Sequence, residues 1–450
     1  MSQLREHWSS RLGFVFAAAG SAIGLGVLWK FPYTVGKEGG GLFILAYFLC
    51  VLLVGIPLFM GELVLGRHAQ LSAVGAFTGR GISSKWKSVG WIAVLASFLI
   101  MSYYSVIAGW CMSYSLMSLT GIFKGKSAQE VGSIFETLSS SGFISMFWHG
   151  LFTLITVSIV VSGVRKGIEQ WSKMMTKALL VILLCLFFYS MSLSGFGKAV
   201  TFMFYPDLTT FKWTSVLEAL GLAFFTLSLG QGIMITYGSY MQKSEDIPKM
   251  GVIIGSMIIF VAILAGLSIF PVLFTFDFPS QGGYGLVFQT LPYLFDQLPG
   301  SLILSSIFFV LLFFCALTSA VPLIEVVAAT LIDMYEWQRT KAAVAVGIAA
   351  FLFGLPSCFA KTSILDSWQL IYGMDFLSTM DHLVTVWLLP VGGWLTAFFV
   401  GWRMDKNVVW QEFIAGSSWK WAWTVWLIFI RYVVPISVFA IIVQKSGVLD

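Results

Sequence analysis

The chain has 450 residues, of which 58% are hydrophobic and only 10% are charged, and its mean hydropathy is +0.89. These values exclude a soluble globular protein, because so few charged residues could not cover the surface of a domain of this size. They indicate a helical membrane protein with several spans, and the net charge of +5 does not indicate a nucleic-acid partner, because the basic residues flank the apolar runs.

Apolar runs of membrane-spanning length predict about eleven transmembrane helices. They cover residues 11–36, 41–65, 89–119, 143–163, 171–194, 215–240, 248–275, 301–332, 342–356, 374–401 and 419–443. Most lysines and arginines lie in segments on the same side as the N-terminus. For a protein integral to the cell (inner) membrane, as we expect here, this asymmetry predicts a cytoplasmic N-terminus and, because the span number is odd, a C-terminus outside.

The first span carries residues that a simple membrane helix does not need. It reads RLGFVFAAAGSAIGLGVLWKFPYTVGKEGGG over residues 11–41. Gly20, Gly24 and Gly26 each cost up to ~1 kcal/mol against alanine in a helix interior, and Pro32 lacks a backbone donor. Freed backbone groups inside a bilayer need partners within the protein, so we predict that this helix unwinds near residues 22–26 beside a binding site. The alternative is that the glycines only form a close-packing face.

The sixth span, SVLEALGLAFFTLSLGQGIMITYGSY over residues 215–240, has a similar interruption at residues 228–232. Spans one and six are the first spans of two five-span halves, and paired breaks at these positions are typical of inverted-repeat transporters. This correspondence disfavours the packing-only alternative. The segment after span seven, residues 276–300, is punctuated by Pro292 and Pro299, which predicts a folded piece that serves as a lid over an outer vestibule or as a cap on the bundle.

Several sequence blocks resemble the neurotransmitter:sodium symporter family, in particular its bacterial amino-acid transporters of the LeuT type. The blocks are RLGFVFAAAGSAIGLGVLWKFPY, EGGGLFILAYFLCVLLVGIPLFMGELVLG, FFTLSLGQGIMITYGSY, GLVFQTLP, FFCALTSA and the region of Asp381. The likeness covers essentially the whole chain. It implies one all-α transporter domain over residues 1–450 with the LeuT-type fold and discontinuous helices one and six. Its inverted repeats would cover about 11–194 and 215–401, with an extra helix at about 419–443.

The resemblance implies sodium-driven symport, and it places a second-site sodium ion among carbonyl and hydroxyl oxygens, which hard cations prefer. The residues that would supply these oxygens are Gly20, Ile23, Cys315, Thr318 and Ser319. The alternative is that the hydroxyls of Thr318 and Ser319 only bond their own helix.

The first sodium site of the family lacks ligands in this sequence. Val27 stands where the family has an asparagine, Ile258 replaces a polar residue in span seven, and Ser21 stands where asparagine is also usual. Only the Ala22 carbonyl and Thr226 remain, so we predict one coupled sodium per substrate. We expect no chloride site either, because residues 222 and 262 are leucine and alanine where polar or acidic groups are expected.

The substrate would lie between the two breaks. Gly24 leaves no carboxylate at the position where amine-transporting relatives place aspartate, so an amino acid that brings its own carboxylate fits better. The amides of Leu25 and Gly26 and the Tyr104 hydroxyl would receive that carboxylate. Gln231 replaces an apolar residue and makes a polar side-chain pocket possible. The predicted substrate residues are Ala22, Gly24, Leu25, Gly26, Ile100, Tyr104, Phe225, Thr226, Ser228, Gln231, Ser319 and Leu323.

The resemblance also implies two gates, one on each side of the substrate site. The outer gate would consist of Lys30 and Asp381 above Tyr104 and Phe225, and lysine in place of the usual arginine removes the bidentate fork. The residues of the inner gate would be Arg5, Trp8, Tyr240 and Asp333. The alternative for each pair is plain anchoring at the membrane interface.

The sequence therefore predicts a sodium-coupled symporter for a neutral amino acid. It would work by rocking spans one, two, six and seven against the rest. The five cysteines lie in or at the ends of apolar runs without a CxxC pair, and no HExxH motif occurs, so neither a metal centre nor an enzyme is indicated. Two alternatives stay open: the same fold carrying an amine or another zwitterion, and a non-transporting membrane receptor. The expected partners are the amino acid and the lipid bilayer, not nucleic acid; the oligomeric state is not predicted.

Overall fold

The computed structural model describes residues 5–78, 82–206, 208, 212–279 and 283–445, and these residues contain helices and connecting turns without β-strands. The helices of the first half are α1 (Arg11–Ala22), α2 (Phe31–Glu38), α3 (Gly41–Cys50), α4 (Ile56–Ala69), α5 (Lys87–Leu119), α6 (Ala128–Ser140), α7 (Gly142–Val161), α8 (Gln170–Ser190) and α9 (Phe196–Phe204).

The second half contains α10 (Trp213–Thr226), α11 (Ile233–Gly238), α12 (Ile247–Thr275), α13 (Leu291–Asp296), α14 (Ser301–Tyr335), α15 (Arg339–Cys358), α16 (Asp366–Tyr372), α17 (Phe376–His382), α18 (Leu389–Phe398), α19 (Lys406–Ile414), α20 (Trp423–Ile428) and α21 (Val434–Lys445). Short π-helical segments join several neighbours into longer rods, for example α3 with α4 and α20 with α21.

The predicted spans correspond closely to these rods. Within the described residues, nine helices are long and apolar enough to cross a membrane, and a bent pair over residues 11–38 makes a tenth. The remaining predicted span, the sixth at 215–240, does not pass this length test because it is divided into α10 and α11. The predicted short ninth span is α15, a helix of 20 residues.

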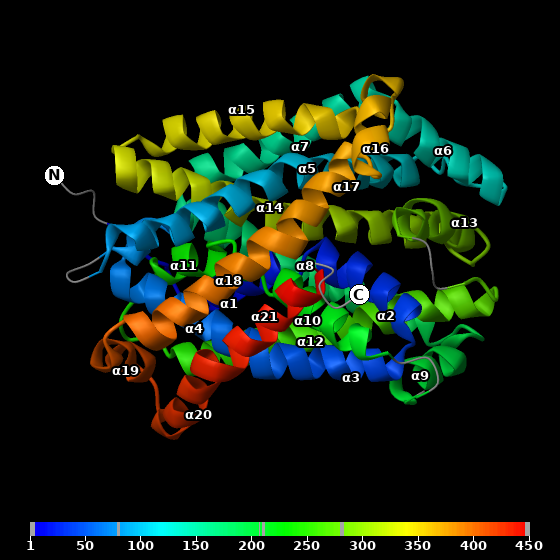
Figure 1. The fold of residues 1–450 in the computed structure, drawn as a ribbon. Helices are drawn as coiled ribbons and strands as arrows, with labels where there is room; N and C mark the ends of the chain where they lie inside the picture. The colour runs from blue at the N-terminus through cyan, green and yellow to red at the C-terminus, as the bar shows by residue number, and fades with distance from the viewer. Residues whose placement is uncertain (1–4, 79–81, 207, 209–211, 280–282, 446–450) are drawn as a thin grey trace.

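Helix α1 lies at the centre of the bundle. The two longest helices, α5 and α14, lie side by side, and α7 and α15 pack against this pair, while α8 packs against α14. Helix α1 contacts α8 and α14 as well as α11 and α12, so it is enclosed by both halves of the chain. The long helices run along one axis (Figure 1). We call the end of the bundle near Arg5 the N-terminal face and the end near α6 and α13 the opposite face.

Both predicted breaks are confirmed. Helix α1 ends at Ala22, and a π-helical turn begins at Gly26 and continues into α2, with a bend of 47° between the two parts. Helix α10 ends at Thr226, and α11 begins only at Ile233. The second break needs left-handed backbone at Ser228 (φ 55°), Gly230 (φ 75°) and Gly232 (φ 74°). Glycine adopts this conformation without strain, which explains two of the three residue types.

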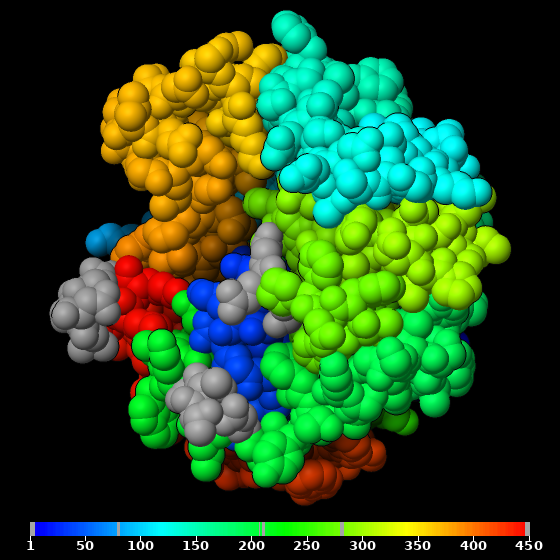
Figure 2. All heavy atoms as spheres, turned by 90° about the vertical axis from the view of Figure 1, so that its right-hand side faces the viewer, coloured from blue at the N-terminus to red at the C-terminus, as the bar shows by residue number. Residues whose placement is uncertain are grey.

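The segment after span seven folds as predicted into short pieces, a π-helical turn over Leu286–Thr290 and α13; residues 280–282 lie outside the described part. The indole nitrogen of Trp29 donates a hydrogen bond to the carbonyl of Gly283 at 3.0 Å, and the Trp29 and Tyr284 ring centroids are 4.6 Å apart. These contacts attach the segment to the first span at the opposite face. Figure 2 shows this face hollowed at its centre, with blue residues from the N-terminal part of the chain between orange and green residues.

Candidate transport site

A small cavity lies between the two breaks. Its lining combines backbone from both breaks with side chains from α5 and α14: Ser21, Ala22, Gly24, Leu25, Gly26, Ile100, Tyr104, Phe225, Ser228, Gln231, Ile233, Ser319 and Leu323. Every predicted substrate residue except Thr226 is in this set. The hydroxyl of Thr226 instead lies 2.8 Å from the hydroxyl of Tyr47, and both residues are buried.

The rigid wall of the cavity comes from two long helices. Ile100 and Tyr104 are four residues apart on α5, and Ser319 and Leu323 are four apart on α14, so each pair lies on one helix face. Because α5 and α14 pack against each other over much of their length, these faces hold a fixed position. The other wall is the unwound backbone of spans one and six.

The carbonyl of Ser21 connects the two breaks with α14. It accepts hydrogen bonds from the hydroxyl of Ser319 at 2.8 Å and from the hydroxyl of Ser228 at 3.3 Å. Sequence reasoning did not include Ser21 or Ile233 among the substrate residues. A serine within an apolar run was the available signal for Ser21, whereas nothing distinguished Ile233 from core residues.

The backbone amides at the start of the helical turn after the first break favour the binding of an anion. The first hydrogen bonds of the new helix run from the amides of Val27 and Leu28 to the Gly24 carbonyl, at 3.1 and 3.4 Å. The amides of Leu25 and Gly26 precede these bonds, and such N-terminal amides attract negative charge. The Tyr104 hydroxyl lies beside the Leu25 backbone and Ser319, but it is buried without a hydrogen bond of good geometry.

The residues predicted to bind sodium lie near the end of α1 and on α14 beside it. The thiol of Cys315 donates to the Ile23 carbonyl at 2.8 Å, and a β-carbon added at Gly20 would lie 3.4 Å from that of Thr318. The Thr318 hydroxyl bonds the carbonyls of Phe314 and Cys315 within its own helix, both at 3.0 Å, as the alternative interpretation expects. The Ser319 hydroxyl bonds across to span one, which that interpretation does not expect. In the structure, the Ile23 and Cys315 carbonyls and the hydroxyls of Thr318 and Ser319 each already take part in one of these hydrogen bonds.

The region expected for the first sodium site is apolar. Val27, Ile258 and Ala262 are completely buried, and Leu222 is 4% exposed. The turn over residues 26–30 packs against α12, so Val27 faces a hydrophobic environment. The hydroxyl of Thr226 is hydrogen-bonded with that of Tyr47, and the other four side chains offer no oxygen.

The outer-gate residues are brought together at the opposite face. The Lys30 amine lies 3.8 Å from a carboxylate oxygen of Asp381 and 4.7 Å from the centroid of the Phe225 ring. The hydroxyl of Tyr103, which sequence reasoning did not include, donates to Asp381 at 3.0 Å. Both charged side chains keep one third of their surface exposed, so this pair is loose.

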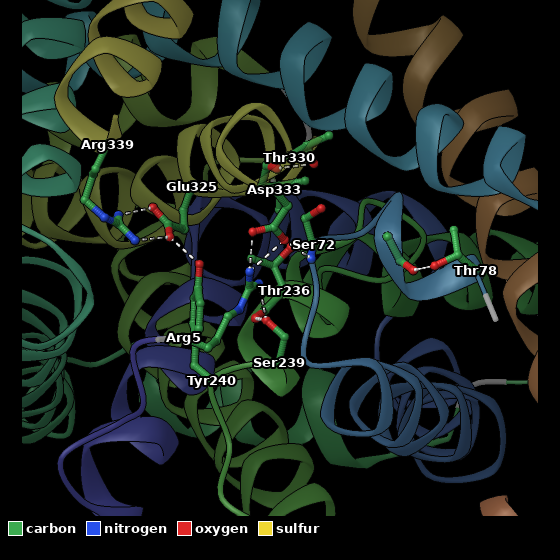
Figure 3. A network of polar contacts seen from close by, with 12 residues as sticks. Arg5, Ser72, Thr78, Thr236, Ser239, Tyr240, Glu325, Thr330, Asp333 and Arg339 are labelled. Carbon is green, nitrogen blue, oxygen red and sulfur yellow. Dashed lines mark hydrogen bonds and ion pairs between the residues drawn. The ribbon is translucent and has the colours of Figure 1, made fainter. Parts of the chain in front are cut away.

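The inner-gate residues form a tighter network at the N-terminal face (Figure 3). The guanidinium of Arg5 donates to both carboxylate oxygens of Asp333 at 2.6 Å and to the Ser239 hydroxyl at 2.6 Å, and it lies 4.8 Å from the Tyr240 ring. Trp8 is 1% exposed, and its indole donates to the Tyr237 carbonyl at 3.0 Å. These contacts therefore pack the N-terminal segment tightly against the helices at this face.

Further ion pairs surround this gate. The Tyr240 hydroxyl donates to the fully buried Glu325 at 2.5 Å, and Arg339 donates to the same carboxylate at 2.8 and 3.1 Å.

On α19, outside the spanning helices, Glu412 contacts Arg67. Burial raises the pKa of Glu412, but hydrogen bonds from His68 and Lys243 and the Arg67 charge lower it to about 2. Glu412 is thus ionised at neutral pH and fixes α19 to the end of α4.

Removing Arg5 should open the N-terminal face. In Arg5→Ala, Asp333 loses its cationic partner at a site where its side chain is only 12% exposed, which destabilises the closed state by about 2–3 kcal/mol. We expect a cysteine placed at the buried Thr236, in a Cys185→Ala background, to react at least about 30-fold faster with a thiol reagent. The control Lys198→Ala removes a pair whose side chains are 64% and 83% exposed and should change nothing. Equal labelling in both variants would show that the pair does not hold the gate.

Glu62 lies beside the break of span six, and its charge within an apolar span was a signal in the sequence, but it was not among the predicted site residues. It is the only charged residue in the predicted span 41–65, and charges inside spans are functional candidates. It is completely buried, and one carboxylate oxygen accepts from the Gly230 amide at 2.9 Å. It therefore supports the unwound backbone of span six from α4.

Comparisons with known proteins agree with this geometry. A sequence model described as the sodium:neurotransmitter symporter family matches residues 5–130 and 123–448. The chain belongs to this family. An uncharacterized sodium-dependent transporter of Bacillus subtilis (strain 168) is 37% identical over 444 residues, which cover 98% of both chains. The neutral amino acid transporter B(0)AT2 of Bos taurus is 29% identical over 300 residues, 60% of this chain and 41% of that one.

A solved structure is similar over the whole length. The crystal structure of MhsT in complex with L-phenylalanine has a TM-score of 0.89 and 38% sequence identity, covering 97% of this chain and 99% of that one. As a sodium:neurotransmitter symporter family member, the chain is an integral membrane protein and a sodium-dependent transporter, not an enzyme. The predicted LeuT-type fold is confirmed.

Proposed function

We propose that this chain is a sodium-coupled symporter for a neutral amino acid, with one sodium per substrate and no chloride. The observation that carries the proposal is the cavity between the two breaks, which offers two helix-starting amides and a buried, unpaired Tyr104 hydroxyl but no charged side chain in its lining. A zwitterion satisfies these groups, because its carboxylate meets the amides and its ammonium meets carbonyl oxygens of the breaks.

The lining also argues against an amine substrate. An amine cation without a carboxylate would enter a buried site that has no acidic side chain to pair with it, which is costly. An amino acid carries its own counter-charge. Two relatives support this class: MhsT has been solved with L-phenylalanine, and B(0)AT2 is described as a neutral amino acid transporter.

The proposed sodium ligands are the carbonyls of Gly20, Ile23 and Cys315 and the hydroxyls of Thr318 and Ser319. All five are next to the end of α1, so a bound cation would stabilise the break that also binds the substrate. This shared dependence is the physical basis of coupling, since the ion and the amino acid favour the same conformation of span one.

Alternating access would use the two gates. The tight network of Arg5 and Asp333 closes the N-terminal face, whereas the looser pair of Lys30 and Asp381 leaves the opposite face easier to open. With the N-terminus in the cytoplasm, substrate would enter from outside through the hollow of the opposite face. Rocking of the spans that contain the breaks would then exchange which gate is closed.

The test is uptake into proteoliposomes, with all amino acids and biogenic amines screened under an inward sodium gradient. We expect accumulation of neutral amino acids that disappears when the sodium gradient is collapsed. Binding without accumulation of any compound would favour the receptor alternative, and accumulation of amines alone would overturn the amino-acid assignment.

The same vesicles measure stoichiometry. Because Val27 and Ile258 bury apolar side chains where a first ion would need ligands, we expect the flux ratio or reversal potential to give about one sodium per amino acid. Replacing chloride with gluconate should leave uptake unchanged. A ratio near two would mean that other oxygens complete a second cation site.

A further inference from the structure

Gln231 occupies an unusual place in the wall of the cavity. It lies in the break of span six between two glycines with positive φ, Gly230 and Gly232. Its backbone carbonyl accepts a hydrogen bond from the hydroxyl of Ser97 at 2.6 Å, which fixes the residue against α5. Its side chain lines the cavity and is only 5% exposed.

The carboxamide of Gln231 makes no hydrogen bond to any residue that the structure describes. A primary amide offers one acceptor oxygen and two donor hydrogens, and buried polar groups of this kind normally have partners. The lining also includes the apolar side chains of Ile100, Ile233 and Leu323, which cannot supply one. Because the side chain lines the cavity, a hydrogen-bonding group of a bound ligand can supply the partner.

Gln231 is fixed beside the part of α5 that would face the substrate's side chain, not the part that would face its carboxylate. Its anchor, Ser97, precedes Tyr104 by seven residues, which corresponds to roughly 10 Å along the helix axis. Tyr104 lies beside the Leu25 backbone, where the carboxylate is proposed to bind. A long amino acid held at Tyr104 would place the end of its side chain past Ile100 and near Gln231.

We propose that Gln231 makes the symporter prefer neutral amino acids whose long side chains end in a hydrogen-bonding group, over apolar analogues of the same shape. The inference rests on the proposed function, because it assumes that the cavity binds an amino acid. Tyrosine and glutamine belong to the preferred class, and phenylalanine and methionine are their apolar counterparts. Charged side chains are excluded, because no residue of the lining carries an opposite charge.

Matched substrate pairs in the proteoliposome assay test this preference. We expect the wild-type protein to take up tyrosine at least about fivefold better than phenylalanine, and glutamine better than methionine, at limiting concentration. In Gln231→Met, which keeps the volume and removes the amide, both ratios should fall by about tenfold. The same substitution at the exposed Gln411, far from the cavity on α19, should leave both ratios unchanged.

The outcomes separate this inference from the proposed function. Wild-type preference for the apolar member of both pairs would overturn the inference without requiring any variant to fold. Equal ratios in the wild type and in Gln231→Met, with sodium-dependent uptake preserved, would also overturn it and leave the proposed function standing. Absence of amino-acid accumulation in the wild type would overturn both.

Discussion

The double variant Thr318→Val and Ser319→Ala is expected to lose sodium-dependent substrate binding. Two of the five proposed oxygen ligands come from these hydroxyls, and valine and alanine offer none. If each lost ligand costs about 1.5 kcal/mol, sodium affinity falls by roughly 100-fold. The measurement is a sodium titration of amino-acid binding to the purified protein, in which the half-saturating sodium concentration should move beyond the accessible range.

Single variants and a matched control make this result specific. Thr318 lies outside the lining of the substrate cavity, so Thr318→Val should weaken sodium more than it weakens the amino acid at saturating sodium. Thr330→Val is the control, because Thr330 is a buried threonine of the same helix that back-bonds the Val326 carbonyl at 2.8 Å. A normal sodium titration of the double variant would remove the proposed ion site.

Gly24→Ala is expected to abolish amino-acid binding. A β-carbon at this position would lie 2.3 Å from the hydroxyl oxygen of Ser319 and 3.2 Å from its β-carbon, distances that the packed protein cannot accept without movement. The Ser319 hydroxyl is short and is held by the Ser21 carbonyl, so it cannot swing away cheaply. We expect at least a roughly 100-fold loss of affinity, from displacement of the break that presents the substrate-binding amides.

Gly221→Ala is the matched control for this prediction. Gly221 lies inside α10 with nothing within 4 Å of an added β-carbon, so alanine should be tolerated and should favour the helix slightly. Both variants should be compared by direct binding and by thermal stability in detergent. Normal binding by Gly24→Ala would show that the substrate does not depend on this close approach of spans one and α14.

The breaks illustrate how much of the site is local in the sequence. Gly20, Gly24 and Gly26 predicted the first break to within a few residues, because backbone cost is a property of the residues themselves. The spacing of Ile100 with Tyr104, and of Ser319 with Leu323, likewise follows from helix geometry alone. Such features do not depend on what packs nearby, so sequence reasoning could reach them.

Contacts between segments that are far apart in the chain could not be predicted from local sequence patterns. Thr226 was expected at the substrate, but the structure pairs its hydroxyl with Tyr47, a residue of α3 that no local pattern connects to it. The role of the Ser21 carbonyl as acceptor for Ser228 and Ser319, and the support of Gly230 by Glu62, also join segments that are far apart in the chain. The choice of partner for each polar group depended on which helices lie side by side.

The sequence by itself determined that the chain crosses a membrane, where its spans lie and which two of them are interrupted, because hydropathy and backbone preference act within a few turns of helix. Only the tertiary structure decided which hydroxyls stay free for a ligand and which are occupied by neighbours. The physical reason is that a buried polar group must be satisfied by whatever packing brings within about 3 Å of it.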